Sequence, residues 1–82
     1  MTKVKVSVLL FVAEYFDFNI SVWQNANGEF RVLTADENGI DSAVTNFEDV
    51  AETVTECLTE ADNGECEIKF CSTVFERYFE EV

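Results

Sequence analysis

The sequence predicts a small α+β domain: an antiparallel sheet with one main amphipathic helix packed on one face, in the order β-β-β-α-β-α. Three observations support this fold class. Apolar and polar residues alternate over most of residues 3–35, as they do in half-buried strands. Apolar residues then recur at helical spacing from Phe47 to Ala61. Alternation returns at Cys66, before a second, short helical pattern. A chain of 82 residues is expected to form a single domain, 1–82.

Three strands are expected before the main helix. The first, Lys3–Ala13, is apolar on both faces in its second half, which is typical of a central strand. The second, Phe16–Val22, alternates cleanly, and the third covers Phe30–Ala35. Between them, Asn27-Gly28 predicts a tight hairpin, because both residues tolerate positive φ.

The next segment, residues 36–46, is polar and is expected to be a loop with at most a short bridge at Ile40–Val44. Thr45-x-x-Glu48 fits a capping box at the start of the main helix, and Asn63-Gly64 is typical of its end. The helical spacing predicts which side chains pack on the sheet. They are Val50, Ala51, Val54 and Leu58.

A last strand is expected over Cys66–Ser72, followed by a short terminal helix that Thr73-x-x-Glu76 caps. The apolar residues of that helix recur at i, i+3, i+4 and i+7; they are Phe75, Tyr78, Phe79 and Val82. The simplest interpretation is that they face the core. The alternative is an aromatic anchor for a partner or for a homodimer, because Tyr and Phe are enriched at interface centres.

Charge is the dominant compositional feature. Seventeen acidic residues against five basic ones give a formal charge of −12, while a hydrophobic fraction of 48% indicates a chain that folds. Direct binding to nucleic acid or to an anionic membrane is disfavoured, because both need Lys and Arg. No apolar run reaches the roughly 20 residues of a membrane span. We expect a cytoplasmic protein, and a bacterial host cytoplasm if it is phage-encoded.

The residues usual in catalysis are missing. The chain has no histidine, and its carboxylates fall mainly on faces expected to be exposed, so no enzyme is expected. Three cysteines without histidine offer no fourth zinc ligand, and they are interpreted as structural thiols. The "DENGID" segment, residues 36–41, departs from the calcium-loop pattern after its fourth residue. Neither a metal nor another cofactor is expected.

One acidic pattern stands out on the main helix. Glu48, Glu52, Glu56 and Glu60 recur at spacing four, and like charges at i,i+4 cost roughly 0.2–0.5 kcal/mol per pair. One interpretation is a solvated face of an acidic protein. The other is a row of carboxylates about 6 Å apart that mimics phosphates, which repeat about every 3.4 Å along each DNA strand.

The candidate partner-binding residues are therefore acidic. The first group is the row Glu48, Glu52, Glu56 and Glu60, and the second is Asp36, Glu37 and Asp41 in the expected loop. The expected partner is a basic nucleic-acid-binding protein, such as a nuclease or a CRISPR or restriction component.

Two family resemblances point the same way. The size, the charge and the lack of catalytic residues resemble those of phage-encoded DNA-mimic inhibitors of the anti-CRISPR, anti-restriction and glycosylase-inhibitor kinds. The segment "GEFRVLTADENGIDSAVTNFEDVAETVTECL" is similar in layout to the HicB-like antitoxin domain, over Phe18 to Leu58. There "GEFRV" matches a strand and "TNFEDVAETV" a helix start with Ala51 at a small packing position. This second resemblance implies a small basic RNase toxin as partner. A third alternative is a structural or assembly protein whose charge serves solubility.

Overall fold

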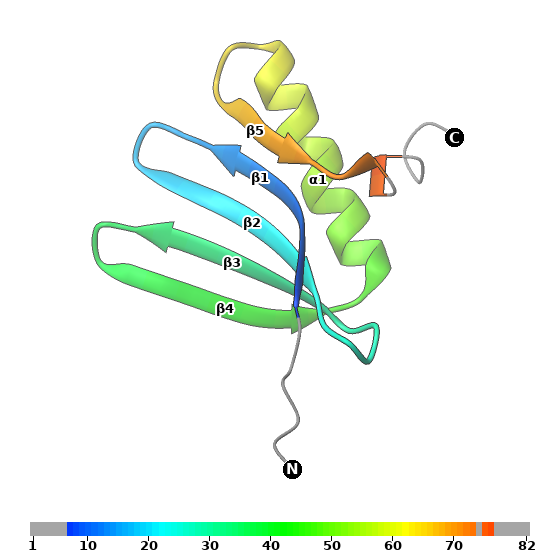
Figure 1. The fold of residues 1–82 in the computed structure, drawn as a ribbon. Coiled ribbons are helices and arrows are strands. Elements are labelled where there is room, and N and C mark those ends of the chain that lie inside the picture. Colours follow the sequence, from blue (N-terminus) through cyan, green and yellow to red (C-terminus); the bar gives the residue numbers. More distant parts are fainter. Residues whose placement is uncertain (1–6, 74, 77–82) are drawn as a thin grey trace.

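The computed structural model describes residues 7–73, 75 and 76, and it confirms the α+β class. An antiparallel sheet of five strands, in the order β4-β3-β2-β1-β5, carries the helix α1 on one face (Figure 1). The elements are β1 (Val8–Glu14), β2 (Phe18–Gln24), β3 (Phe30–Asp36), β4 (Gly39–Thr45), α1 (Phe47–Asp62) and β5 (Glu67–Cys71). Thr73, Phe75 and Glu76 are also helical.

Strand β1 lies between β2 and β5, so the prediction of a central strand is confirmed. Strict alternation would put Leu10 and Val12 on one face and Leu9 and Phe11 on the other, and this expectation is wrong beyond Leu9. A β-bulge shifts the register between Leu9 and Phe11, so Leu10 and Phe11 are both buried, and Val12 faces the side away from α1. The first part of the expected strand, residues 3–6, lies outside the described residues.

The β2–β3 hairpin forms where Asn27-Gly28 predicts it, but with a different turn. Among the described residues only glycines have positive φ, and here it is Gly28 at 85°, not Asn27. Asn25 organises the turn, because its side-chain oxygen accepts the backbone N–H groups of Asn27 (3.0 Å) and Glu29 (2.9 Å). Strand β2 begins later than expected, which leaves the Phe16 side chain fully exposed in the preceding turn.

The expected loop over residues 36–46 is wrong, because most of it is strand β4, paired with β3 along its whole length. Asp36 closes a tight turn by accepting the N–H of Asn38 (2.8 Å), and Gly39 supplies a φ of 136°. Every residue of β4 except Thr45 is exposed. The segment is rich in polar residues because it forms an edge strand that is exposed on both faces.

Helix α1 begins one residue later than the expected capping box. Asn46 is the N-cap, and its side chain accepts the N–H of Asp49 at 2.9 Å. Thr45 instead donates its hydroxyl hydrogen to the Asp49 carboxylate (3.0 Å). Asp49 therefore takes the position that the sequence pattern gave to Glu48.

The end of α1 is as predicted. Asn63 is the C-cap and Gly64, with φ of 79°, follows it in the left-handed conformation. The N–H of Glu65 donates to the carbonyl of Glu60 (2.8 Å), and the N–H of Gly64 to that of Ala61 (3.1 Å). This pair of bonds is a Schellman motif, and it directs the chain back toward the sheet.

The buried stripe of α1 differs from the expected one by one position. Val50, Val54 and Cys57 are buried, whereas Leu58 is 40% exposed, so its expected core position is wrong. One residue further along a helix turns the side chain by about 100°. Leu58 therefore points to the flank of the helix once Cys57 faces the sheet.

The segment after β5 returns to the core. Phe75 is 1% exposed, which confirms the core interpretation for this residue. The cap is Ser72 and not Thr73, because the Ser72 hydroxyl oxygen accepts the N–H of Phe75 at 3.1 Å. Tyr78, Phe79 and Val82 lie outside the described residues.

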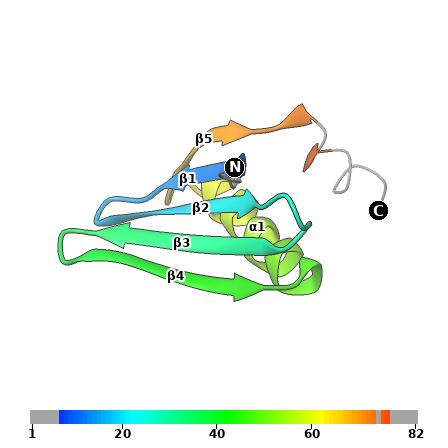
Figure 2. The ribbon, with the colours of Figure 1, turned by 60° about the horizontal axis from the view of Figure 1, so that its bottom comes forward.

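The core lies between the sheet and α1, on one side of the sheet only. In Figures 1 and 2 the sheet stands in front of the helix, and none of the described elements covers its near face. The described part of the chain contains no helix with the length and hydropathy to span a membrane. The buried residues of the core are Leu10, Phe11, Ala13, Val22, Val50, Val54, Cys57 and Phe75.

Candidate interaction surface

The outward side of α1 carries the row of glutamates. Glu48, Glu52 and Glu56 are exposed, because they lie opposite the buried stripe of Val50, Val54 and Cys57. Glu60, the fourth member, is half-buried. The helix therefore brings three of the four predicted residues together at the surface and turns the last toward the sheet.

These carboxylates have no counter-charge nearby. Across residues 7–73, 75 and 76, the ion pairs are those of Lys69 with Glu67 (3.2 Å) and Glu14 (3.9 Å). No hydrogen bond within that part of the chain engages the side chains of Glu48, Glu52 or Glu56. The last turn of α1 contains no basic residue. The charge of the row therefore faces solvent and is not neutralised by ion pairs within the described part of the chain.

The second predicted group lies elsewhere. Asp36 and Glu37 are at the β3–β4 turn, which Figures 1 and 2 show at the end of the sheet far from the start of α1. Asp41 is exposed on the edge strand β4, where it pairs with Thr34. Because Asp36 also closes its own turn, it has a structural role. The structure does not join these residues to the helix row in one surface.

Sequence reasoning missed a cluster around Tyr15 at the edge of the core. The Tyr15 hydroxyl donates to the sulfur of Cys57 (3.4 Å), and the Cys66 thiol donates to the Cys57 carbonyl (3.3 Å). The Tyr15 ring stacks on Phe18, with centroids 4.5 Å apart and planes at 8°. No motif could reveal it, because the residues come from separate parts of the chain: the β1–β2 turn, β2, α1 and the connection between α1 and β5.

Tyr15, Cys57 and Cys71 all have raised pKa values, as expected for structural groups that are partly or fully buried. Burial raises the pKa of Tyr15 above its ordinary value, and the hydrogen bond to Cys57 adds to the effect. Burial also raises the pKa of Cys57, although the Tyr15 bond opposes the rise, and burial raises the pKa of Cys71. Reactive cysteines have lowered pKa values, so Cys57 and Cys71 are not activated nucleophiles.

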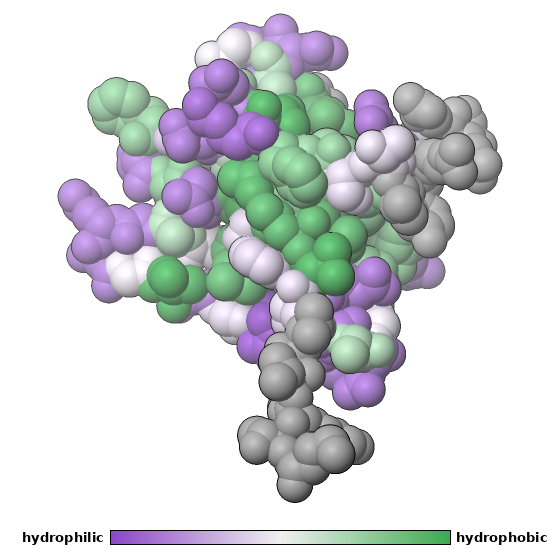
Figure 3. Space-filling view, in the orientation of Figure 1, coloured by the Kyte–Doolittle hydropathy of each residue, from purple (hydrophilic) through white to green (hydrophobic). Residues whose placement is uncertain are grey.

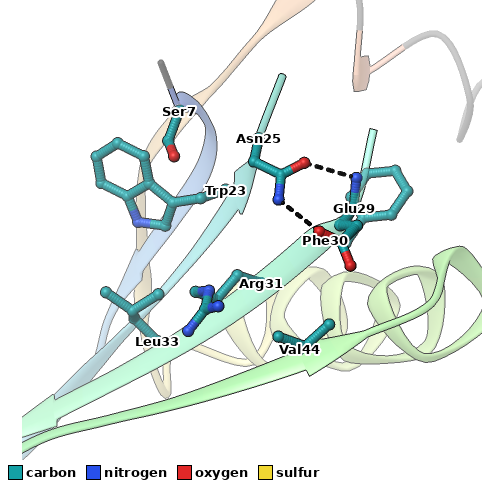
Figure 4. Close-up of a pocket in the computed structure, with 8 residues that line it drawn as sticks. All are labelled: Ser7, Trp23, Asn25, Glu29, Phe30, Arg31, Leu33 and Val44. Atoms are coloured by element: carbon teal, nitrogen blue, oxygen red, sulfur yellow. Dashed lines mark hydrogen bonds between the residues drawn. The ribbon is translucent and has the colours of Figure 1, made fainter. Parts of the chain in front are cut away.

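The sheet face away from α1 has a shallow hollow of about 160 Å³ beside Trp23 (Figure 4). Arg31 lies in it and donates to the Ser42 hydroxyl at 2.8 Å, while Asn25 holds Glu29 at 2.8 Å. Sites for small molecules usually enclose about 300–1,000 Å³. This hollow is below that range. Among the described residues, no three His, Cys, Asp or Glu side chains are grouped to hold a metal ion.

The chain matches no protein-family model, no curated protein and no solved structure. The surface itself is therefore the basis for any functional argument.

Proposed function

We propose that this protein is a non-enzymatic acidic inhibitor that binds a basic nucleic-acid-binding protein through the outward side of α1. In this proposal the helix occupies a Lys/Arg-lined groove that otherwise holds a nucleic-acid backbone. The partner is a component of a host defence or DNA-processing system, as for inhibitors of the anti-CRISPR or anti-restriction kind.

One observation carries the proposal: Glu48, Glu52 and Glu56 are exposed and unpaired within the described chain, on a helix with six acids and no base. Each step of four residues advances about 6 Å along the helix axis, a spacing of the same order as that of backbone phosphates. A helix selected for stability alone would gain by placing Lys four residues after Glu. Binding to a cationic groove would explain why α1 keeps glutamates at spacing four although they repel one another.

The test compares two double variants that remove equal charge from different places. Glu52→Gln with Glu56→Gln neutralises the middle of the helix row, and Glu37→Gln with Asp41→Asn removes two of the three acidic charges of the β3–β4 hairpin. We expect the helix variant to lose roughly tenfold in affinity for proteins captured from bacterial lysate, about 1.4 kcal/mol, and the hairpin variant to lose little.

Binding of the captured protein should also depend on salt and on competing DNA. Binding should be strong at about 50 mM NaCl and weak at about 500 mM, since surface charges are screened over a few ångströms at high salt. Duplex DNA should release the captured protein by competition for its groove. Equal capture by both double variants and wild type would leave the helix row as a solvated face. Loss in the hairpin variant alone would move the site to Glu37 and Asp41.

A further inference from the structure

The sheet has a second apolar face that the described chain leaves uncovered. Strand register places alternate residues of each strand on the side away from α1, and eight of them are apolar. We call this side of the sheet the open face, and its apolar residues are Leu9, Val12, Trp23, Leu33, Ala35, Ile40, Val44 and Phe70.

The open face exposes large apolar side chains. Ile40 is 68% exposed, Val44 58% and Phe70 43%, at the two opposite edges of the sheet. Figure 3 shows hydrophobic side chains gathered over β1, with hydrophilic ones around them. Contiguous apolar patches rimmed by polar groups mark interaction sites on soluble proteins.

The charge of the open face differs from that of the rest of the molecule. Its strand residues include the acids Glu14 and Glu67, both paired with Lys69, and the base Arg31. These two acids and two bases cancel, and Glu29 beside the hollow leaves this face with a net charge of −1, whereas the whole chain carries −12. A cationic partner gains little here, and nucleic acid finds no basic patch.

The geometry points to a second copy of this chain as the occupant: we propose that two copies pack their open faces together as a β-sandwich dimer. Both acidic helices then lie on the outside, far from each other, so the contact avoids the like-charge repulsion that other orientations create. Stacked sheets pack about 10 Å apart with side chains interdigitated. This inference is independent of the proposed function.

The size of the open face suits such a contact. Five strands at about 4.8 Å and seven residues at about 3.3 Å span roughly 24 by 23 Å, or about 550 Å² in flat projection. Because side chains project from the sheet, the accessible area is larger than this projection and approaches the roughly 800 Å² per partner of a standard interface.

Trp23 is the largest apolar side chain on the open face, near the end of β2. Its indole N–H already donates to the Ser21 hydroxyl at 3.0 Å, so its polar atom needs no partner from the other copy. The ring borders the hollow of Figure 4, together with Leu33 and Val44. That hollow can take an apolar side chain from the facing copy, and Trp is enriched at the energetic centres of interfaces.

The test uses the full-length protein and its single tryptophan. Sedimentation equilibrium should show the mass rising from 9.3 kDa toward twice that value over roughly 1–100 µM, a range suited to an interface at the small end of the standard size. Over the same range, Trp23 fluorescence should become shielded from acrylamide, a neutral quencher. Added NaCl should strengthen the dimer by screening the repulsion between two acidic chains.

A matched pair of variants locates the interface. Val44→Lys places a charge on the open face, and Leu58→Lys adds the same charge at a similarly exposed site on the opposite side. We expect the first to weaken the dimer at least tenfold and the second to leave it unchanged, with circular dichroism showing both folded. A monomer at about 100 µM with Trp23 freely quenched, or a dimer that Val44→Lys leaves intact, would overturn the proposal.

Discussion

Tyr15 belongs to no sequence motif, but its contacts in the folded protein predict how stability depends on pH. Its hydroxyl group lies against Cys57 of α1, and its ring lies on Phe18. Since burial raises the pKa values of both Tyr15 and Cys57, the folded state favours their protonated forms. Their contribution to stability is complete below the ordinary pKa values of the free groups, and it is lost as pH rises above them.

This gives a prediction for alkaline pH. The free energy of unfolding should be steady near pH 8 and fall as pH passes about 9 to 10, where the thiol and the phenol ionise more readily in the unfolded chain than in the folded protein. Tyr15→Phe should flatten part of that fall, because it removes one of the three groups whose pKa burial raises, the others being Cys57 and Cys71. Urea titrations at several pH values measure it. A slope that the variant leaves untouched would show that Tyr15 ionises as freely in the folded protein as in the unfolded chain.

At the scale of elements, the phase of α1 can be tested with two substitutions to alanine. Val54→Ala removes two buried methyl groups and should cost about 1–3 kcal/mol, after an offset of about 0.5 kcal/mol from the better helix propensity of Ala. Leu58→Ala should cost less than about 1 kcal/mol, since that side chain is 40% exposed. Urea unfolding compares them directly. The reverse order of losses would mean that the Leu58 side of the helix faces the sheet.

Helix α1 also shows which parts of the fold can be predicted from the sequence. Helical periodicity identifies α1, and the Asn63-Gly64 signal identifies its end, because both depend on local geometry. Periodicity leaves the rotation of the helix uncertain by one position, and the sheet decides between Cys57 and Leu58. Strand β4 was missed for a related reason: an edge strand exposed on both faces has no alternation of buried and exposed residues to detect.

For the candidate surface, sequence spacing alone groups Glu48, Glu52 and Glu56, since residues of one helix stay together in any fold. It could not show that Asp36, Glu37 and Asp41 lie at the other end of the sheet. It could not show the open face either, because only strand pairing over long sequence separations brings Trp23, Val44 and Phe70 to the same side of the sheet.

At the scale of the whole molecule, charge and hydrophobicity are separated in space. The helix side carries the unpaired acids, and the open face is more apolar and nearly neutral. The two proposals are compatible, because a face-to-face dimer exposes its two acidic helices on opposite surfaces. Such a dimer could engage two basic partners, or two grooves of one assembly, and gain from effective concentration if the spacing allows.

The charge separation also predicts how stability responds to salt. A net charge of −12 destabilises the compact state by self-repulsion, so the free energy of unfolding should rise by about 1 kcal/mol between low and high NaCl. Glu52→Gln with Glu56→Gln removes three i,i+4 repulsions of the helix row and should raise stability at low salt by roughly 0.6–1.5 kcal/mol. The same variant should then gain less from added salt. Urea unfolding at protein concentrations where the chain is monomeric measures both effects. A variant less stable than wild type would mean that these carboxylates are held by attraction within the fold, and a surface of that kind would have no charge to offer a partner.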